Sequence, residues 1–149
     1  MTMKTHISIL CLIIGLALIS CTQNQAESQQ DTPTTTAPAV NMALVQRGIT
    51  VYKEQYCGIC HQLTAANTAG TFGPSHDGVA TRAENYLVNE NYSGTATTAA
   101  EYLRESLLNP EIYIVDGFGA SPHQMPAYTF LPDADIDALV YMLLQQPEN

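Results

Sequence analysis

The sequence predicts an all-α domain in which three to four helices are joined by long loops. Three segments place apolar residues at intervals of three and four, which is the spacing of one helix face. Between these segments the chain is rich in Gly, Pro, Thr and Asn, which favour loops. We find no convincing strand pattern of alternating apolar and polar residues. At 149 residues, the chain suits one such domain with appendages.

The first residues are typical of a secretory signal. Lys4 precedes an almost wholly apolar run over residues 7–19, which is shorter than the roughly 20 residues that cross a bilayer. An uncleaved membrane anchor is the alternative. The run ends in Leu-Ile-Ser-Cys, residues 18–21, which resembles the lipobox of bacterial lipoproteins. That resemblance implies a signal peptide over residues 1–20 and a lipid on Cys21; otherwise Cys21 merely lies near a cleavage site without lipid.

Residues 21–41 predict a flexible tether, and residues 42–149 the folded domain. The tether is mostly Thr, Gln, Pro and Ala, which bury too little apolar surface to fold. We therefore expect an exported protein that is lipid-anchored to a bacterial membrane, with its domain on the periplasmic or extracellular side. From Cys21 onward the chain has 4 basic and 14 acidic residues. This charge argues against nucleic-acid binding and predicts that a protein partner would have a basic docking surface.

The first helix of the domain is expected to start near Met42 and to run into the cysteine pair that begins at Cys57. Its apolar face contains Leu44, Val45, Gly48, Ile49, Tyr52 and Tyr56. Residues 62–78 are rich in Thr, Ala, Asn and Gly and predict a loop. A short helix is expected after Asp77.

The two later helices have clear ends. Thr98 and Glu101 form a capping-box pattern, and an Asn-Pro pair at residues 109–110 ends that helix. Its apolar side contains Tyr102, Leu103 and Leu107. Residues 116–132 predict an extended loop, and residues 133–146 the last helix, with an acidic start. Its core-facing stripe contains Ile136, Leu139, Val140, Leu143 and Leu144. Because so much of the domain is loop, we expect another group to fill its centre.

Residues 57–61, Cys-Gly-Ile-Cys-His, can hold a disulfide, a metal or a covalent haem. A thioredoxin-like disulfide needs strands that alternate with helices, and structural zinc usually takes paired ligand clusters. The same motif is the attachment signal of c-type haem, in which two thiols add to vinyl groups and the histidine ligates iron. The predicted export also favours a covalent haem. We therefore predict one haem c, covalent through Cys57 and Cys60, with His61 on the iron.

With this motif, residues 42–149 resemble class I cytochrome c, which implies the cytochrome c fold around a single haem. A Gly-Pro pair at residues 73–74 is similar to the family's pair whose proline carbonyl accepts the ring N–H of the axial histidine. The resemblance therefore implies a contact between Pro74 and His61. A further match concerns the close crossing of the first and last helices, through Gly48, Tyr52 and Tyr141.

The Met-Pro pair at residues 125–126 resembles the pair that carries the second axial ligand in this family. Met125 lies in a Pro-rich loop, 64 residues after His61, whereas Met142 lies among apolar residues and suits core packing. His123 is the alternative ligand. His76 is expected to face solvent or to bond a loop carbonyl.

Three polar residues are weaker candidates for the haem pocket. Arg82 follows the Gly-Pro loop, and Tyr113 and Tyr128 flank the methionine loop. Each could donate a hydrogen bond to a haem propionate. The alternative is a solvated arginine and two packed tyrosines.

The predicted function is single-electron transfer between respiratory or photosynthetic complexes, as a mobile carrier or as a subunit, and not enzymatic catalysis. Two axial ligands that stay in place leave no open iron face for a substrate. The alternative is a haem-based sensor of small ligands or a small peroxidase. It requires the Met125 loop to swing away from the iron, and Gly117 and Gly119 give this loop some freedom.

Overall fold

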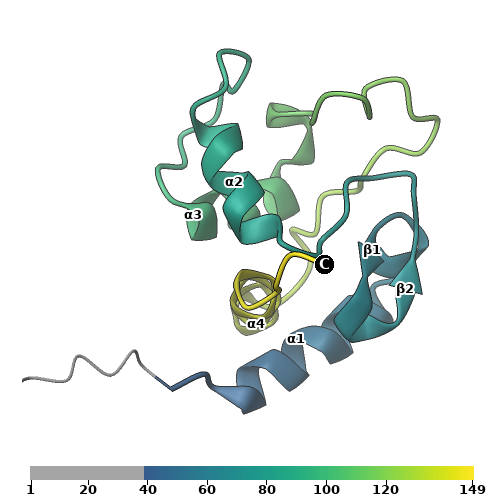
Figure 1. The fold of residues 1–149 in the computed structure, drawn as a ribbon, viewed down its shortest axis with the longest axis vertical. Helices are drawn as coiled ribbons and strands as arrows, with labels where there is room; N and C mark the ends of the chain where they lie inside the picture. Colours follow the sequence, from purple (N-terminus) through teal and green to yellow (C-terminus); the bar gives the residue numbers. More distant parts are fainter. Residues whose placement is uncertain (1–38) are drawn as a thin grey trace, which may run out of the picture. The chain divides into compact units, whose positions relative to one another are not determined.

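The structure is a computed structural model that describes residues 39–149 (Figure 1). The expected signal peptide, Cys21 and nearly all of the predicted tether lie outside these residues. The described part is mostly helical, with four helices and two very short strands, which is compatible with the all-α prediction. Its helices are α1 (Met42–Glu54), α2 (Val79–Leu87), α3 (Ala99–Leu108) and α4 (Asp133–Leu144), with short 3-10 turns at Cys57–Ile59, Thr64–Ala66 and Pro110–Ile112. Within residues 39–149, no helix combines the length and the apolar character needed to cross a membrane.

Helix α1 begins and ends close to the predicted positions. The side chain of Asn41 caps it by accepting hydrogen bonds from the backbone N–H groups of Ala43 and Leu44. The prediction that Tyr56 belongs to its buried face is wrong. The helix ends at Glu54, and Tyr56 has a left-handed backbone with φ 57° and is 72% exposed. Val51 is in the core instead, one turn earlier.

Helices α1 and α4 cross at Gly48, as expected. A Cβ atom on Gly48 would lie 2.4 Å from the carbonyl oxygen of Ala138 and 2.4 Å from Cβ of Met142, so only a hydrogen fits. Tyr141 does not make this contact: its hydroxyl accepts a hydrogen bond from the Asn41 N–H at 2.7 Å. In Figure 1, α1 passes beneath α4, while α2 and α3 pack together on the other side of α4.

A minimal β-hairpin lies within the segment that the sequence predicts as loop. Strand β1 (Gln62–Leu63) pairs antiparallel with β2 (Thr68–Ala69). The hydroxyl of Thr68 completes the pairing, because it accepts the N–H of Leu63 and donates to the carbonyl of His61, both at 3.0 Å. Two-residue strands are too short to show an alternating pattern, so the sequence gives no sign of them.

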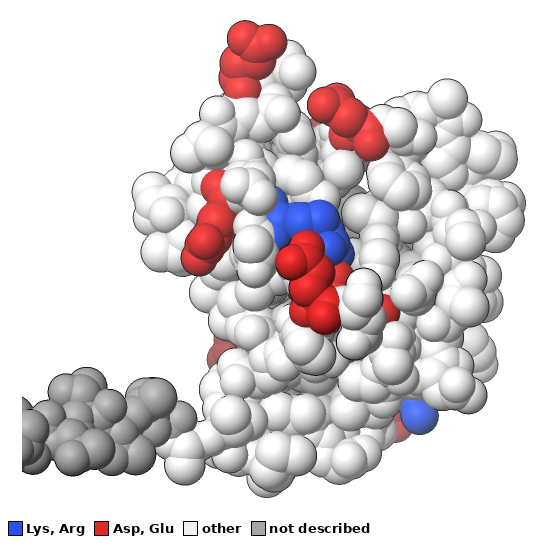
Figure 2. All heavy atoms as spheres, viewed as in Figure 1, with Lys and Arg blue, Asp and Glu red and all other residues white. Residues whose placement is uncertain are grey.

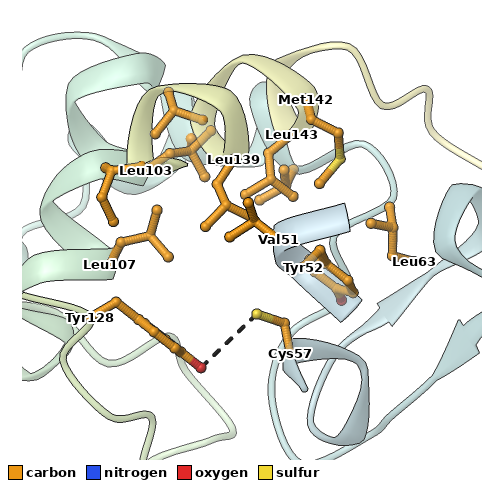
Figure 3. Close-up of a cluster of buried hydrophobic side chains, with 14 of the residues drawn as sticks. Val51, Tyr52, Cys57, Leu63, Leu103, Leu107, Tyr128, Leu139, Met142 and Leu143 are labelled. Carbon is orange, nitrogen blue, oxygen red and sulfur yellow. Dashed lines mark hydrogen bonds between the residues drawn. The ribbon is translucent and has the colours of Figure 1, made fainter. Parts of the chain in front are cut away.

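The remaining helices follow their sequence signals. Helix α2 is the short helix expected after Asp77, and α3 starts with the predicted capping box between Thr98 and Glu101. Figure 3 shows the core that α1, α3 and α4 share, with these side chains labelled: Val51, Tyr52, Cys57, Leu63, Leu103, Leu107, Tyr128, Leu139, Met142 and Leu143. Met142 is fully buried and packs in the core as predicted.

The acidic start of α4 is partly neutralised by ion pairs. Arg104 of α3 bonds to Asp133 and Asp137, and Arg47 of α1 bonds to Asp135. These pairs tie the two neighbouring helices to the first turns of α4. Each is at least partly exposed, so we expect about 0–1 kcal/mol from each pair.

Candidate functional site

A cavity opens beside the core and is lined by residues from α1, α2, α3, α4 and the long loops. It holds about 1220 Å³ of empty space, including solvent at its mouth. The structure brings the residues predicted to bind the haem and its iron, Cys57, Cys60, His61 and Met125, to its wall. Pro74 lines it as well. The expectation that another group fills the centre of the domain is consistent with this space.

His61 is held in one orientation. The residue is 7% exposed, and its Nδ1 lies 2.7 Å from the carbonyl oxygen of Pro74. Since a carbonyl only accepts, Nδ1 carries the proton and Nε2 keeps its lone pair. Burial lowers the pKa of His61, and the bond to Pro74 offsets part of this shift. His61 is therefore neutral near pH 7, the state in which imidazole binds a metal.

Two glycines allow the chain to approach His61 closely. A Cβ atom on Gly73 would lie 2.4 Å from Cε1 of the His61 ring. A Cβ atom on Gly70 would lie 2.5 Å from the carbonyl carbon of Cys60. Contacts this short do not occur, so glycine is required for the loop to pack here. The first of these glycines is the one that the Gly-Pro match singles out.

The prediction for His76 is wrong: its ring stacks on the ring of His61. The ring centroids are 4.0 Å apart and the ring planes differ by 12°. The Tyr52 hydroxyl donates to the His61 carbonyl at 3.2 Å and meets Nδ1 of His76, also at 3.2 Å. Burial, the ring of His61 and the charge of Arg82 keep the pKa of His76 well below its usual value. No spacing rule places His76 here, because the loop path depends on backbone contacts.

Cys57 and Cys60 are both free thiols in the described chain. Cys57 is buried, and burial raises the pKa of its thiol. Figure 3 shows its sulfur pointing toward the hydroxyl of Tyr128, and the two atoms are 4.0 Å apart. Cys60 is half-buried and lines the cavity as well. The two thiols therefore face the same space from one short turn.

Both candidates for a second axial ligand reach the cavity. Met125 is half-buried and packs against the core, whereas His123 is exposed. Each of them lines the cavity wall. The ring of His123 contacts Phe72 edge-on, with centroids 4.6 Å apart. Because Met125 is more buried than His123, it is the better candidate for the second ligand.

Tyrosines form much of the remaining wall. Tyr113 and Tyr128, which the sequence analysis singles out, are buried and line the cavity. Four further tyrosines of the wall, Tyr52, Tyr56, Tyr86 and Tyr102, were not among the predicted site residues. The rings of Tyr86 and Tyr102 contact each other and Tyr113. Burial raises the pKa of Tyr102 to about 12. The only sequence signal for the position of Tyr102 is its place on the apolar side of α3.

Arg82 does not line the cavity. Its guanidinium donates to the backbone carbonyls of Ser75 and Asp77, the latter at 2.6 Å, and lies 3.9 Å from the carboxylate of Glu148. These contacts hold the guanidinium of Arg82 outside the cavity wall. Tyr113 and Tyr128, by contrast, line the cavity.

The cavity wall is nearly free of charge. Glu111 is the one Lys, Arg, Asp or Glu among its lining residues. Residues 55–76 and 117–132, which contribute much of the wall, contain none of these four residue types. On the face drawn in Figure 2, charged side chains gather over one half, and the half over the long loop and the β-hairpin is almost wholly uncharged. The acidic character of the protein therefore lies mainly away from the cavity.

The arrangement suits a large organic group with a metal at its centre better than a bare metal ion. Among residues 39–149, no group of three or more His, Cys, Asp or Glu side chains is placed to hold a metal ion. Two cysteines, one methionine and three histidines (His61, His76 and His123) instead line one largely apolar cavity. Neither the comparison with models of protein families nor that with curated proteins returned a match.

Proposed function

We propose that residues 42–149 form a class I cytochrome c domain that carries single electrons on one covalent haem. One observation carries the proposal: the two cysteines and the histidine of residues 57–61 line one cavity together with Met125, which comes from a distant loop. The hydrogen bond between Pro74 and His61 supports it, because the resemblance to this family implies that contact. The close crossing of α1 and α4 at Gly48 supports the cytochrome c fold in the same way.

The residues present fit this cofactor. Cys57 and Cys60 would bind it through thioether bonds, and His61 and Met125 would be the axial ligands. When bound, the haem supplies one-electron chemistry at its iron. The proton on Nδ1 of His61 fixes the tautomer that leaves Nε2 for the metal. The apolar wall excludes water from the site, and the thioether of Met125 favours a high reduction potential.

The chain restrains its histidine ligand from two sides, which suits electron transfer. Pro74 holds the Nδ1 edge of His61, and the ring of His76 lies against its face. A ligand that moves little between oxidation states keeps the reorganisation energy small.

The place of the carrier follows from the sequence. A lipid on Cys21 and the tether of residues 21–41 would hold the domain at a membrane surface outside the cytoplasm. There it would pass electrons between respiratory or photosynthetic complexes, as a mobile carrier or as a subunit. Its acidic residues would attract partners with a basic surface at long range, and its uncharged cavity mouth would make the close contact.

Covalent haem is the direct test of this function. The protein purified from cells that attach c-type haem should keep one haem through denaturation, measured by intact mass and by absorption of the denatured chain. Cys57→Ser and Cys60→Ser should each leave one bond, and the double variant none. A wild-type chain with two free thiols and no attached haem would refute the proposal.

A second function has one observation in its favour. Met125 is only half-buried, and Gly117 before it has φ 91° with open space around its Cα. A loop of this kind could move Met125 away from the iron, as a sensor of small ligands or a small peroxidase requires. The reduced wild-type protein would then bind carbon monoxide readily. In a carrier, only Met125→Ala should do so.

A further inference from the structure

We propose that Asp77 and Arg82 form a clasp that holds the Pro74 carbonyl against the ring of His61. The inference rests on the proposed function, because the clasp acts on a haem ligand. It makes Asp77 a positioning residue: its carboxylate does not line the cavity, and its effect reaches the site through the loop of residues 73–77.

Asp77 ties this loop to the residues that follow His61. Its side chain is buried, with the residue 5% exposed. The carboxylate accepts hydrogen bonds from the Thr64 N–H at 2.9 Å, the Thr64 hydroxyl at 2.8 Å and the Gln62 amide at 3.1 Å. A buried carboxylate is costly unless such donors surround it. Its partners therefore determine where it sits, and all three donors lie within three residues of His61.

Arg82 holds the same loop from the other side. Its guanidinium, at the start of α2, donates to the carbonyls of Ser75 and Asp77. These two carbonyls flank His76, the residue whose ring stacks on His61. One side chain thus fixes the backbone on both sides of that stacked ring.

Backbone bonds complete the attachment on either side of Pro74. The N–H of Gly73 donates to the carbonyl of Cys60 at 2.9 Å, and the N–H of His76 donates to the carbonyl of Gln62 at 2.8 Å. Pro74 has no N–H of its own to add. Its carbonyl is therefore positioned by the backbone bonds of the neighbouring residues. The side chains of Asp77 and Arg82, which form the clasp, add to these bonds.

The position of the carbonyl matters because the bond to His61 is short. A hydrogen bond of 2.7 Å is lost when the oxygen moves away by about 1 Å. The bond raises the basicity of the imidazole, which favours the more highly charged oxidised metal. Loosening the clasp should therefore destabilise the oxidised form and raise the reduction potential.

The test compares the haem-loaded wild type with Asp77→Ala, Asp77→Asn and the control Glu84→Gln. Glu84 is an exposed carboxylate on α2, so its variant removes one negative charge without touching the loop. Two quantities are measured: the reduction potential, and the rate at which the Nδ1 proton of His61 exchanges with solvent, followed by NMR. The second quantity reports the contact itself.

Asp77→Ala should speed this exchange at least tenfold. It should also shift the equilibrium between the two oxidation states about tenfold toward the reduced form, which raises the reduction potential by about 59 mV for a one-electron couple. Asp77→Asn should lie between Asp77→Ala and wild type, because an amide oxygen still accepts from Thr64. Glu84→Gln should leave the exchange rate unchanged. If Asp77→Ala does not fold, Thr64→Val, which removes only the hydroxyl donor, should shift both quantities in the same direction by less.

A wild-type chain that carries haem, with exchange and potential unchanged in the folded Asp77 and Thr64 variants, would overturn the clasp and leave the proposed function intact. A wild-type chain without haem would overturn both. The two failures are therefore distinguishable.

Discussion

The carbonyl oxygen of Pro74 lies 2.7 Å from Nδ1 of His61, although the two residues are 13 positions apart in the chain. This bond selects the tautomer of the proposed iron ligand. It exists only because Gly73 lets the backbone lie against the imidazole ring. Several residues that no sequence pattern relates to one another support this one contact.

Gly73→Ala should displace the His61 ring. The added Cβ would lie 2.4 Å from Cε1 of His61, and the ring is packed between Gly73 and His76. We expect a loss of about 1–3 kcal/mol in the free energy of unfolding, the usual range for overpacking, measured with urea. Gly119→Ala is the matched control, because a Cβ atom on Gly119 would make only an ordinary contact, with Cγ2 of Ile114 at 4.0 Å. Equal stability of the two variants would contradict the packing described for His61.

Gly48→Val should weaken the crossing of α1 and α4. Its side chain would collide with the carbonyl of Ala138 and with Met142, and both atoms belong to the rigid α4 backbone or lie next to it. We expect a loss of several kcal/mol, more than for Gly48→Ala, since the larger side chain forces the helices further apart. Thermal unfolding followed by circular dichroism checks the order wild type, Ala, Val. A Val variant as stable as wild type would show that the helices do not meet at Gly48.

The stability of the domain should fall in acid partly through Asp77. Burial alone would raise the pKa of its carboxyl, but the hydrogen bonds from Thr64 and Gln62 outweigh burial and hold the pKa below the usual value. A folded pKa below the unfolded one means that the stabilisation is complete above the unfolded pKa, about 3.9, and is lost as pH falls through the folded pKa. Urea unfolding between about pH 6 and pH 2 measures this loss.

Asp77→Asn should reduce this dependence on pH without abolishing it. The pKa values of Glu101 and Glu105 are also lowered, mainly by hydrogen bonds to the Thr95–Thr98 segment, and these groups keep their contribution. A variant with the full wild-type loss of stability in acid would show that the Asp77 carboxylate is not held by its partners in the ionised form.

Electron transfer should be sensitive to charge at the cavity mouth and much less sensitive to charge elsewhere. Ile114 is 44% exposed and lines the cavity, whereas Val88 is 83% exposed at the end of α2 and does not. Ile114→Glu should speed oxidation by a small cationic metal complex at low salt, and added salt should cancel the gain, because the Debye length falls to about 8 Å at 0.15 M. Val88→Glu adds the same charge and is the control. Equal effects would mean that electrons do not leave through this mouth.

The helices could be predicted from the sequence because their signals are local. The cap at Thr98, the Asn-Pro stop and the stripe of α4 each depend on residues a few positions apart. The cysteine-histidine motif could also be identified from the sequence, and the contact between Pro74 and His61 could be predicted from the family resemblance. Each of these features lies within a short, ordered stretch of chain.

The rest of the site depends on loop paths that local patterns do not encode. Tyr56 leaves the predicted helix face because the backbone turns left-handed there, and His76 enters the site because Arg82 holds carbonyls on both sides of it. For Arg82 the sequence leaves two possibilities open, a hydrogen bond to a haem propionate and a solvated side chain. Its actual partners are backbone oxygens, which carry no sequence signal.

The most direct test of the central claim is the far-red absorption spectrum of the purified oxidised protein. A sulfur atom on ferric haem gives a weak charge-transfer band in this region. We expect the band in wild type and in Met42→Ala, whose methionine is exposed at the start of α1, and its loss in Met125→Ala. A haem-loaded wild type without the band, or a band that survives Met125→Ala, would contradict ligation by His61 and Met125.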